Sequence, residues 1–357
     1  MNANSYNRNS YVQRRNDLNA VLDAIRLRDG LGAALDALIA QQFDAGFIED
    51  DLTTVRRYRI CHPGDRSRSF SLQFNPRRAL RHGGSGRVQP PPGSVAVNSG
   101  CFLCDANIAW QQRGLELGFD LSIGDVNYTC YANPFPLMPA HVTVATHAHV
   151  PQGWSTAGVD GAPALSEVVS HLLTLAEQLP SFIVFFNGPD AGASIPAHFH
   201  FQVFKHMPAH DAFPLERWPR ADDSADPRLD GYPLTVACFD GAHDDMVTRA
   251  SAWMARSATQ FGNVGALSAN LMAMHTEGRV QLYVAPRHRA YSYAPGFAGL
   301  VGGLEILGEL VLSTEQEKQQ LDIGHFSFEG VAAILAAVEP PGTASSRSGN
   351  SAAGPGC

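Results

Sequence analysis

His198-Phe199-His200-Phe201-Gln202, in the middle of the chain, alternates polar and aromatic side chains. Successive side chains of an extended strand point to opposite faces, so we expect His198, His200 and Gln202 on one face. The two phenylalanines then face a hydrophobic core. The stretch therefore predicts a strand that carries three polar side chains in a row and has a buried back.

The segment before this strand is rich in small residues. Asn187-Gly188 and residues 191–194 (AGAS) predict a loop whose backbone N–H groups can approach a phosphate. Pro196 keeps the entry to the strand extended. His198, His200 and Gln202, the polar row, would by themselves also fit the solvent-exposed face of an edge strand. The glycine-containing loop before them favours a nucleotide site.

Composition is that of a globular enzyme. The chain has 357 residues, 45% hydrophobic and 17% charged, enough for one large core or two medium ones. No apolar run reaches the length of a bilayer span, and residues 1–15 lack a signal-peptide core. Six cysteines in a chain of this size do not indicate a disulfide framework. We expect a cytoplasmic protein with no membrane partner.

The net charge of −8 argues against a nucleic-acid partner. One segment is nevertheless basic, since residues 56–87 hold nine arginines and one acid. Arg77 and Arg78, beside Phe74-Asn75-Pro76, are candidate phosphate contacts because a guanidinium donates two parallel hydrogen bonds. The other arginines fit a solvated face. A nucleic-acid-processing role is a weak alternative, because aromatic residues are not interleaved with these arginines.

Hydrophobic periodicity predicts the main elements. Helical spacing covers residues 18–43, with a break at Asp29-Gly30, and then 164–179 and 246–260. Strands are predicted within residues 58–74, around a turn at Pro63-Gly64, and at 126–131, 141–146, 182–186, 267–274 and 280–285.

Residues 186–205 resemble the active-site segment of the histidine-triad superfamily, on its transferase branch. That branch includes galactose-1-phosphate uridylyltransferase, diadenosine tetraphosphate phosphorylase and the GDP-hexose phosphorylases. The Asn-Gly … His-Phe-His-Phe-Gln pattern is most similar to the GDP-hexose phosphorylases and to uncharacterised bacterial relatives. Those relatives also match residues 73–78 (QFNPRR), Cys101-Phe102-Leu103-Cys104 with Asn107 and Gln111, the motifs NPFP, HVTV and HVPQ within 133–152, and GRV and APR within 278–287.

The resemblance implies an α+β fold, with a histidine-triad-like antiparallel sheet and flanking helices in two fused halves. We expect a catalytic half at 17–206, a linker rich in Pro, Asp and Arg at 207–232, and a second half at 233–338. The second half has no His-x-His-x-Gln row of its own. Residues 1–16 and 339–357 are expected to be disordered.

Cys101 and Cys104 form a CxxC pair, which supplies two of the four ligands that a tetrahedral zinc needs. The resemblance implies that His149 and His198 complete a structural Zn²⁺ site that pins the N-terminal arm to the catalytic strand. A reduced, partly buried cysteine pair without metal is the alternative. Two further histidines are rivals for the third ligand: His141 and His147.

By the same resemblance, His200 is the nucleophile that attacks the α-phosphorus and forms a nucleotidyl-histidine. Its other ring nitrogen is expected to donate to a backbone carbonyl. Gln202 is expected to bind the α-phosphate oxygens. Histidine-triad hydrolases have a third histidine at this position, whereas the transferases have glutamine, which cannot give or take a proton. Gln202 therefore favours transfer over hydrolysis.

Further contacts to the substrate are expected from both halves of the chain. The base pocket is expected around Phe74, Asn75 and the loop after residue 119. Arg287 is a candidate contact to the second phosphate or the sugar. The predicted nucleotide- and phosphate-binding residues are Asn187, Gly188, Ser194, Arg77, Asn75 and Arg287.

Together these features predict a nucleotidyltransferase or phosphorylase. Its substrate would be an NDP-hexose or a dinucleoside polyphosphate, and its acceptor phosphate or a sugar phosphate. Two alternatives stay open, namely a histidine-triad nucleotide hydrolase and a non-catalytic, zinc-stapled nucleotide-binding protein. Histidine-triad proteins often form homodimers, but two fused halves could satisfy that interface within one chain.

Overall fold

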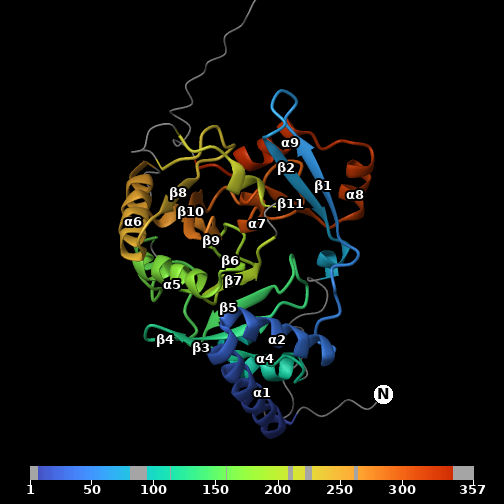
Figure 1. Cartoon of the computed structure of the whole chain (residues 1–357), viewed down its shortest axis with the longest axis vertical. Coiled ribbons are helices and arrows are strands. Elements are labelled where there is room, and N and C mark those ends of the chain that lie inside the picture. The colour runs from blue at the N-terminus through green and yellow to red at the C-terminus, as the bar shows by residue number, and fades with distance from the viewer. Residues whose placement is uncertain are drawn as a thin grey trace, which may run out of the picture.

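An eight-stranded antiparallel sheet runs through the molecule (Figure 1), in the order β3-β4-β5-β7-β6-β9-β10-β8. The structure is a computed structural model and describes residues 7–80, 95–112, 114–157, 159–207, 212–221, 227–260 and 264–340. The strands of this sheet are β3 (Phe119–Ile123), β4 (Val126–Ala132), β5 (Val142–Thr146), β6 (Phe182–Asn187), β7 (His200–Lys205), β8 (Ala237–Asp240), β9 (Leu267–Thr276) and β10 (Arg279–His288).

The N-terminal part of the chain, which ends with β7, and the C-terminal part, which begins with β8, meet inside this sheet. Strand β6 pairs with β9, and the register places Val184 opposite Ala273 and Asn187 opposite Asn270. Strands β3 to β7 thus continue directly into β8 to β10 from the second part of the chain. The predicted α+β class, with a large antiparallel sheet and flanking helices, is confirmed.

A smaller sheet links the beginning of the chain to its end. It has the order β1-β2-β11 and consists of β1 (Arg56–Cys61), β2 (Ser69–Phe74) and β11 (Glu309–Leu312). Strands β2 and β11 are parallel, with Phe74 opposite Leu312. The predicted halves at 17–206 and 233–338 therefore interlock, because a strand of the first is held by a strand of the second.

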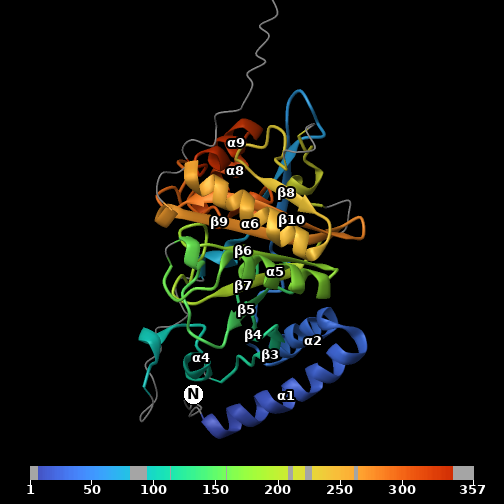
Figure 2. The same ribbon diagram turned by 90° about the vertical axis from the view of Figure 1, so that its left-hand side faces the viewer.

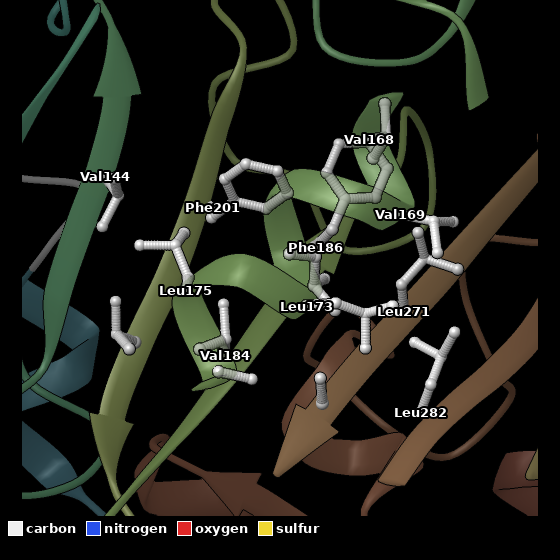
Figure 3. Packing of buried hydrophobic residues seen from close by; sticks show 14 of the residues in the cluster. Val144, Val168, Val169, Leu173, Leu175, Val184, Phe186, Phe201, Leu271 and Leu282 are labelled. Carbon is white, nitrogen blue, oxygen red and sulfur yellow. The ribbon is translucent and has the colours of Figure 1, made fainter. Parts of the chain in front are cut away.

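Helices α5 (Leu165–Gln178) and α6 (His243–Gln260) cover one face of the large sheet (Figure 2). Figure 3 shows the core beneath them, where Phe186 of β6 and Phe201 of β7 lie among Val168, Val169 and Leu271. Phe199, Phe201 and Val203 all belong to this core, as the alternation of the polar row predicted. The polar residues of β7 consequently point to the opposite face.

The opposite face carries the smaller sheet and three short helices. Ile183, Phe185 and Phe204 pack there against residues of β2 and β11. The helices are α7 (Gly303–Ile306), α8 (Glu315–Asp322) and α9 (Phe328–Ala336). This second core fixes the distance between β7 and the C-terminal loops.

The N-terminal segment forms α1 (Arg8–Asp29) and α2 (Leu31–Asp44). They break at Gly30, whose φ of 91° favours glycine, as predicted. The expected disorder of residues 1–16 is wrong from Arg8 onward, and residues 1–6 lie outside the described part. Periodicity missed the first turns of α1 because only Tyr11 is buried there, against Ala109 and Leu117, and Arg15 adds an ion pair with Asp120 (2.6 Å).

The segment predicted as a linker, 207–232, is not one in its described parts. Leu215, Trp218 and Tyr232 are buried in the second core. The Pro- and Arg-rich composition suggested a solvated tether, but the aromatic residues within it anchor the segment. Residues 339–357 were predicted to be disordered. Glu339 instead accepts a hydrogen bond from Thr235 Oγ1 (2.7 Å), and residues 341–357 lie outside the described part.

The remaining elements are short. They are α4 (Asp105–Gln111) and the 3₁₀ turns η1 (Pro76–Leu80), η2 (Asn98–Gly100), η3 (Ser155–Ala157), η5 (Pro214–Arg217) and η6 (Val264–Ala266). Among the described residues, no helix combines the length and the apolar character that a membrane crossing requires.

Candidate active site and metal centre

A cavity of about 420 Å³ opens on the face opposite α5 and α6. His200 and Gln202 of β7 line it together with Asn187 at the end of β6. Its far wall comes from the loop before α7 and the start of that helix, including Gly302 and Gly303. The cavity thus lies between β7 of the first part of the chain and a C-terminal segment of the second.

The ring of His200 is buried and held in one tautomer. Its Nδ1 lies 2.8 Å from the carbonyl oxygen of His198, which can only accept, so Nδ1 carries the proton, as the sequence led us to expect. Nε2 keeps its lone pair, and the ring lines the cavity. Burial lowers the pKa of His200 to about 4, so the imidazole is neutral at pH 7. These are the properties of an imidazole nucleophile.

Gln152 holds the two central strands together where their own pairing ends. The β6–β7 ladder reaches Phe185 opposite Gln202 and goes no further. Beyond it, Gln152 accepts from the backbone N–H of His200 (2.8 Å) and donates to the carbonyls of Asn187 (2.7 Å) and His200 (3.0 Å). The sequence motif HVPQ contains this residue but gave no sign of its role.

Gln202 is oriented by His141. The backbone N–H of Leu137 donates to Nδ1 of His141 (3.1 Å), and Nε2 of His141 lies 2.9 Å from Oε1 of Gln202. Burial lowers the pKa of His141 to about 3, so the ring stays neutral. His141 is therefore not a metal ligand. The other rival, His147, lies 3.2 Å from a carboxylate oxygen of Asp120 and is also outside the metal centre.

Asn187 is oriented by a network from the second part of the chain. Its Oδ1 accepts from Asn270 Nδ2 (2.8 Å) and from the backbone N–H of Gly303 (2.8 Å). Oδ1 of Asn270 in turn accepts from Arg287 (2.7 Å), which also donates to the carbonyl of Val301 (2.7 Å). The Arg287 side chain is fully buried, and burial lowers its pKa to about 10.

The prediction that Arg287 contacts the substrate is consequently wrong, because Arg287 supports Asn187 from behind and does not line the cavity. Gly188 does not line it either, and its N–H donates to the carbonyl of Ala269 (2.8 Å). Ser194 does line the cavity, as predicted, and is exposed. Asn187, Gly192 and Ser194 of this loop thus line the cavity, whereas Gly188 does not.

The basic segment also reaches the cavity differently from the prediction. Arg77 donates to the carbonyl of Glu49 (3.1 Å) outside the cavity, while Arg78 lines it. Asn75 and Phe74 are buried, and Asn75 donates to the carbonyl of Pro136 (3.1 Å). The tight turn η1 sends neighbouring side chains in different directions, which their sequence could not indicate. The cavity wall contains other residues that the prediction of the base pocket missed: Phe102, Gln112, Glu116 and Tyr131.

Cys101, Cys104, His149 and His198 form a four-residue cluster whose ligand atoms lie within 4.8 Å of one another. The two Nδ1 atoms are 3.3 Å apart. The sulfur–nitrogen distances are 3.3 Å (Cys104–His149), 3.5 Å (Cys101–His198) and 3.7 Å (Cys104–His198). These four residues are the set that the resemblance implied, and together they could hold a metal ion.

The four separations given above agree with those of a tetrahedral metal site. With metal–nitrogen bonds of about 2.0–2.1 Å and metal–sulfur bonds of about 2.3 Å, a tetrahedral site separates its ligand atoms by about 3.3–3.8 Å. Nε2 of His198 lies 2.7 Å from the carbonyl of Thr146, so that Nδ1 is left unprotonated toward the cluster. Burial raises the pKa of the Cys104 thiol, so a thiolate there needs a cation beside it.

Comparisons with known proteins agree with this architecture. Residues 40–205 match the sequence family described as Domain of unknown function (DUF4922). No curated protein matches the sequence. The crystal structure of yeast Ap4A phosphorylase Apa2 in complex with AMP is similar, with a TM-score of 0.59 at 15% identity over 87% of this chain and 98% of that chain. The same enzyme in complex with Ap4A gives 0.55 at 16% identity, over 85% and 97%.

At this identity the similarity establishes a shared fold and no more. The resemblance to diadenosine tetraphosphate phosphorylase, predicted from the polar row and its flanking motifs, is confirmed at the level of the fold. The similarity extends over nearly the whole length of the yeast enzyme, so it includes both parts of the chain.

Glu116 provides a test of the cavity wall through pH. Burial raises its pKa from the ordinary value of 4.5 to about 8. Between these values the unfolded state loses a proton that the folded state keeps, so the stability of the protein falls as pH rises from 4.5 to 8. Glu116→Gln removes this loss. The free energy of unfolding of this variant minus that of wild type should therefore be about 3 kcal/mol larger at pH 8 than at pH 5.

Urea unfolding of both proteins at the two pH values measures this difference. The same replacement at exposed Glu315 on α8 is the matched control and should give no pH-dependent difference. An equal effect of Glu116→Gln at both pH values would show that the carboxyl is not sequestered.

Proposed function

We propose that the protein is a nucleotidyltransferase or phosphorylase that acts through a nucleotidyl-histidine on His200. The observation that carries this proposal is the state of that ring. It is neutral, its Nδ1 is tied to the carbonyl of His198 (2.8 Å), and it lines the cavity. Gln202 and Asn187 lie in the same wall and provide amide groups for phosphate oxygens.

The reaction has two displacements. Nε2 of His200 attacks the α-phosphorus, a P–N bond forms, and the P–O bond to the leaving phosphate breaks with its electron pair on oxygen. The positive charge on the ring is stabilised by the carbonyl of His198 through Nδ1–H. An oxygen of inorganic phosphate or of a sugar phosphate then attacks the same phosphorus, the P–N bond breaks, and Nε2 recovers its lone pair.

Transfer is favoured over hydrolysis by the residue at position 202. In its place a histidine could move protons for water or for a leaving group, whereas an amide cannot. The two substrate classes that we propose are NDP-hexoses and dinucleoside polyphosphates. The yeast structures, whose complexes hold AMP and Ap4A, support a nucleotide ligand for this fold. Hydrolysis and nucleotide binding without turnover are the competing functions.

We further propose that the cluster of Cys101, Cys104, His149 and His198 binds Zn²⁺. Two thiolates and two imidazoles suit zinc, and four protein ligands leave no open position, which is typical of a structural site. When bound, the ion would supply structural cross-linking and no reacting group. His198 would then be fixed on both sides, and its carbonyl would hold His200 in place.

The intermediate can be trapped. We expect wild-type protein mixed with an NDP-hexose or a dinucleoside tetraphosphate, without acceptor, to gain the mass of one nucleoside monophosphate. His200→Ala should show no gain and should lower kcat by about 1,000-fold or more, because the nucleophile is gone. Intact-protein mass spectrometry and turnover with and without phosphate measure both effects.

His243→Ala is the matched control, because His243 begins α6 on the other side of the large sheet and does not line the cavity. Its adduct and turnover should equal those of wild type. Equal turnover with and without phosphate would identify a hydrolase. Nucleotide binding without any adduct would identify a binding protein.

The metal has its own test. We expect purified protein to contain about one zinc per chain, and Cys104→Ser to lose it, because three ligands hold a structural zinc far less tightly than four. The midpoint temperature of unfolding should fall by about 5 °C or more. Elemental analysis and thermal unfolding measure the two effects.

Cys61→Ser, outside the cluster, is the control and should keep the zinc. A wild-type protein that contains no metal, and whose melting is unchanged by added zinc, would support the alternative of a reduced cysteine pair.

A further inference from the structure

Two buried hydrogen-bond relays end at the amide groups that line the cavity. We propose that these relays fix the direction of both amides, so that each presents N–H donors to the substrate. Arg287, Asn270 and His141 are then positioning residues that make this wall of the cavity a receptor for phosphate anions. This inference rests on the proposed function, whose reacting group is an activated phosphate, and extends it to residues that never touch the substrate.

The first relay begins at Arg287. A guanidinium can only donate, so the atom of Asn270 that it contacts at 2.7 Å must be the oxygen Oδ1. Nδ2 of Asn270 is then turned toward Asn187 and Ala191, and donates to Oδ1 of Asn187 (2.8 Å) and to the carbonyl of Ala191 (2.7 Å). The backbone N–H of Gly303 requires the same acceptor at 2.8 Å. Two obligatory donors therefore occupy Oδ1 of Asn187.

The second relay begins at the backbone N–H of Leu137, which also can only donate. It occupies Nδ1 of His141 at 3.1 Å, so the proton of the neutral ring is on Nε2. Nε2–H therefore donates to Gln202, and the atom that accepts at 2.9 Å must be Oε1. The side chain of His141 is buried, and the low pKa of its ring keeps this tautomer neutral.

Both relays leave an amide nitrogen for the cavity. Neither Nδ2 of Asn187 nor Nε2 of Gln202 has a hydrogen-bond partner within the part of the chain that the structure describes. Donors that are already oriented bind an anion without the cost of reorienting them. The same amides turned around would present oxygen atoms and repel a phosphate.

The carboxyl groups that line the cavity are compatible with the binding of an anion. Glu116 and Glu305 line it as well, and burial raises the pKa of each. Burial thus disfavours a negative charge on each of them. Oε2 of Glu305 in addition accepts from the backbone N–H of Gly302 (2.9 Å).

Asn270→Asp breaks the first relay with almost no change in shape. The carboxylate still accepts from Arg287, but it cannot donate to Asn187. A carboxylate oxygen would then repel Oδ1 of Asn187, which keeps only the N–H of Gly303 as a donor, so the direction of this amide is no longer fixed. We expect the affinity for inorganic pyrophosphate and for ADP, measured by calorimetry, to fall by about tenfold or more. The midpoint temperature should stay within a few degrees of wild type.

Ser268→Ala is the matched control, because Ser268 is also fully buried on β9, two residues away, and donates to the carbonyl of Pro189 (2.6 Å) outside the relay. It should keep both affinities within about threefold. If Asn270→Asp does not fold, His141→Phe tests the second relay and should weaken pyrophosphate binding in the same way.

Wild-type affinity in folded Asn270→Asp or His141→Phe would overturn the relays and leave the enzyme assignment standing. Pyrophosphate binding that depends on the relays, in a protein that never forms an adduct, would overturn the enzyme assignment and leave the relays standing. A wild-type protein that binds neither ligand at millimolar concentration would overturn both.

Discussion

The backbone carbonyl of His198 connects the Cys₂His₂ cluster to His200 in the cavity. The ring of His198 belongs to the Cys₂His₂ cluster through Nδ1, while its backbone oxygen accepts from Nδ1 of His200. The outer nitrogen of His198 is held by the carbonyl of Thr146 on β5. The position and tautomer of His200 therefore depend on how firmly its neighbour is fixed. A structural metal at the cluster would help to fix the ring of His200 without contacting the cavity residues directly.

Local patterns predicted the parts of the site that lie close together in sequence. A period of two along β7 was enough to separate the polar row from the core phenylalanines. The set of Cys101, Cys104, His149 and His198 is spread over almost 100 residues, and it was predicted from the family resemblance rather than from a local pattern. The main helices and strands followed from apolar spacing, and the break between α1 and α2 from Gly30.

Contacts between distant segments were beyond such patterns. Arg287 looked like a substrate contact, because nothing in its sequence neighbours shows that Asn270 and Val301 enclose it. His141 was a candidate metal ligand and Gln152 had no predicted role, yet both hold residues of β7 in place. Helix α1 began earlier than its apolar spacing suggested, because Tyr11 and the ion pairs of Arg15 find their partners far along the chain. These errors concern side chains whose partners lie elsewhere in the fold.

The parallel pairing of β2 with β11 constrains how the chain can be made. During synthesis β2 emerges early, but the strand that completes its sheet follows only after the whole of the large sheet has been translated. Until then the edge of β2 and its apolar face lack their partners, which exposes a nascent chain to misassembly. The wall that closes the cavity arrives with the same late segment. A ribosome-bound fragment that ends before residue 300 would therefore contain His200 and Gln202 but no finished cavity.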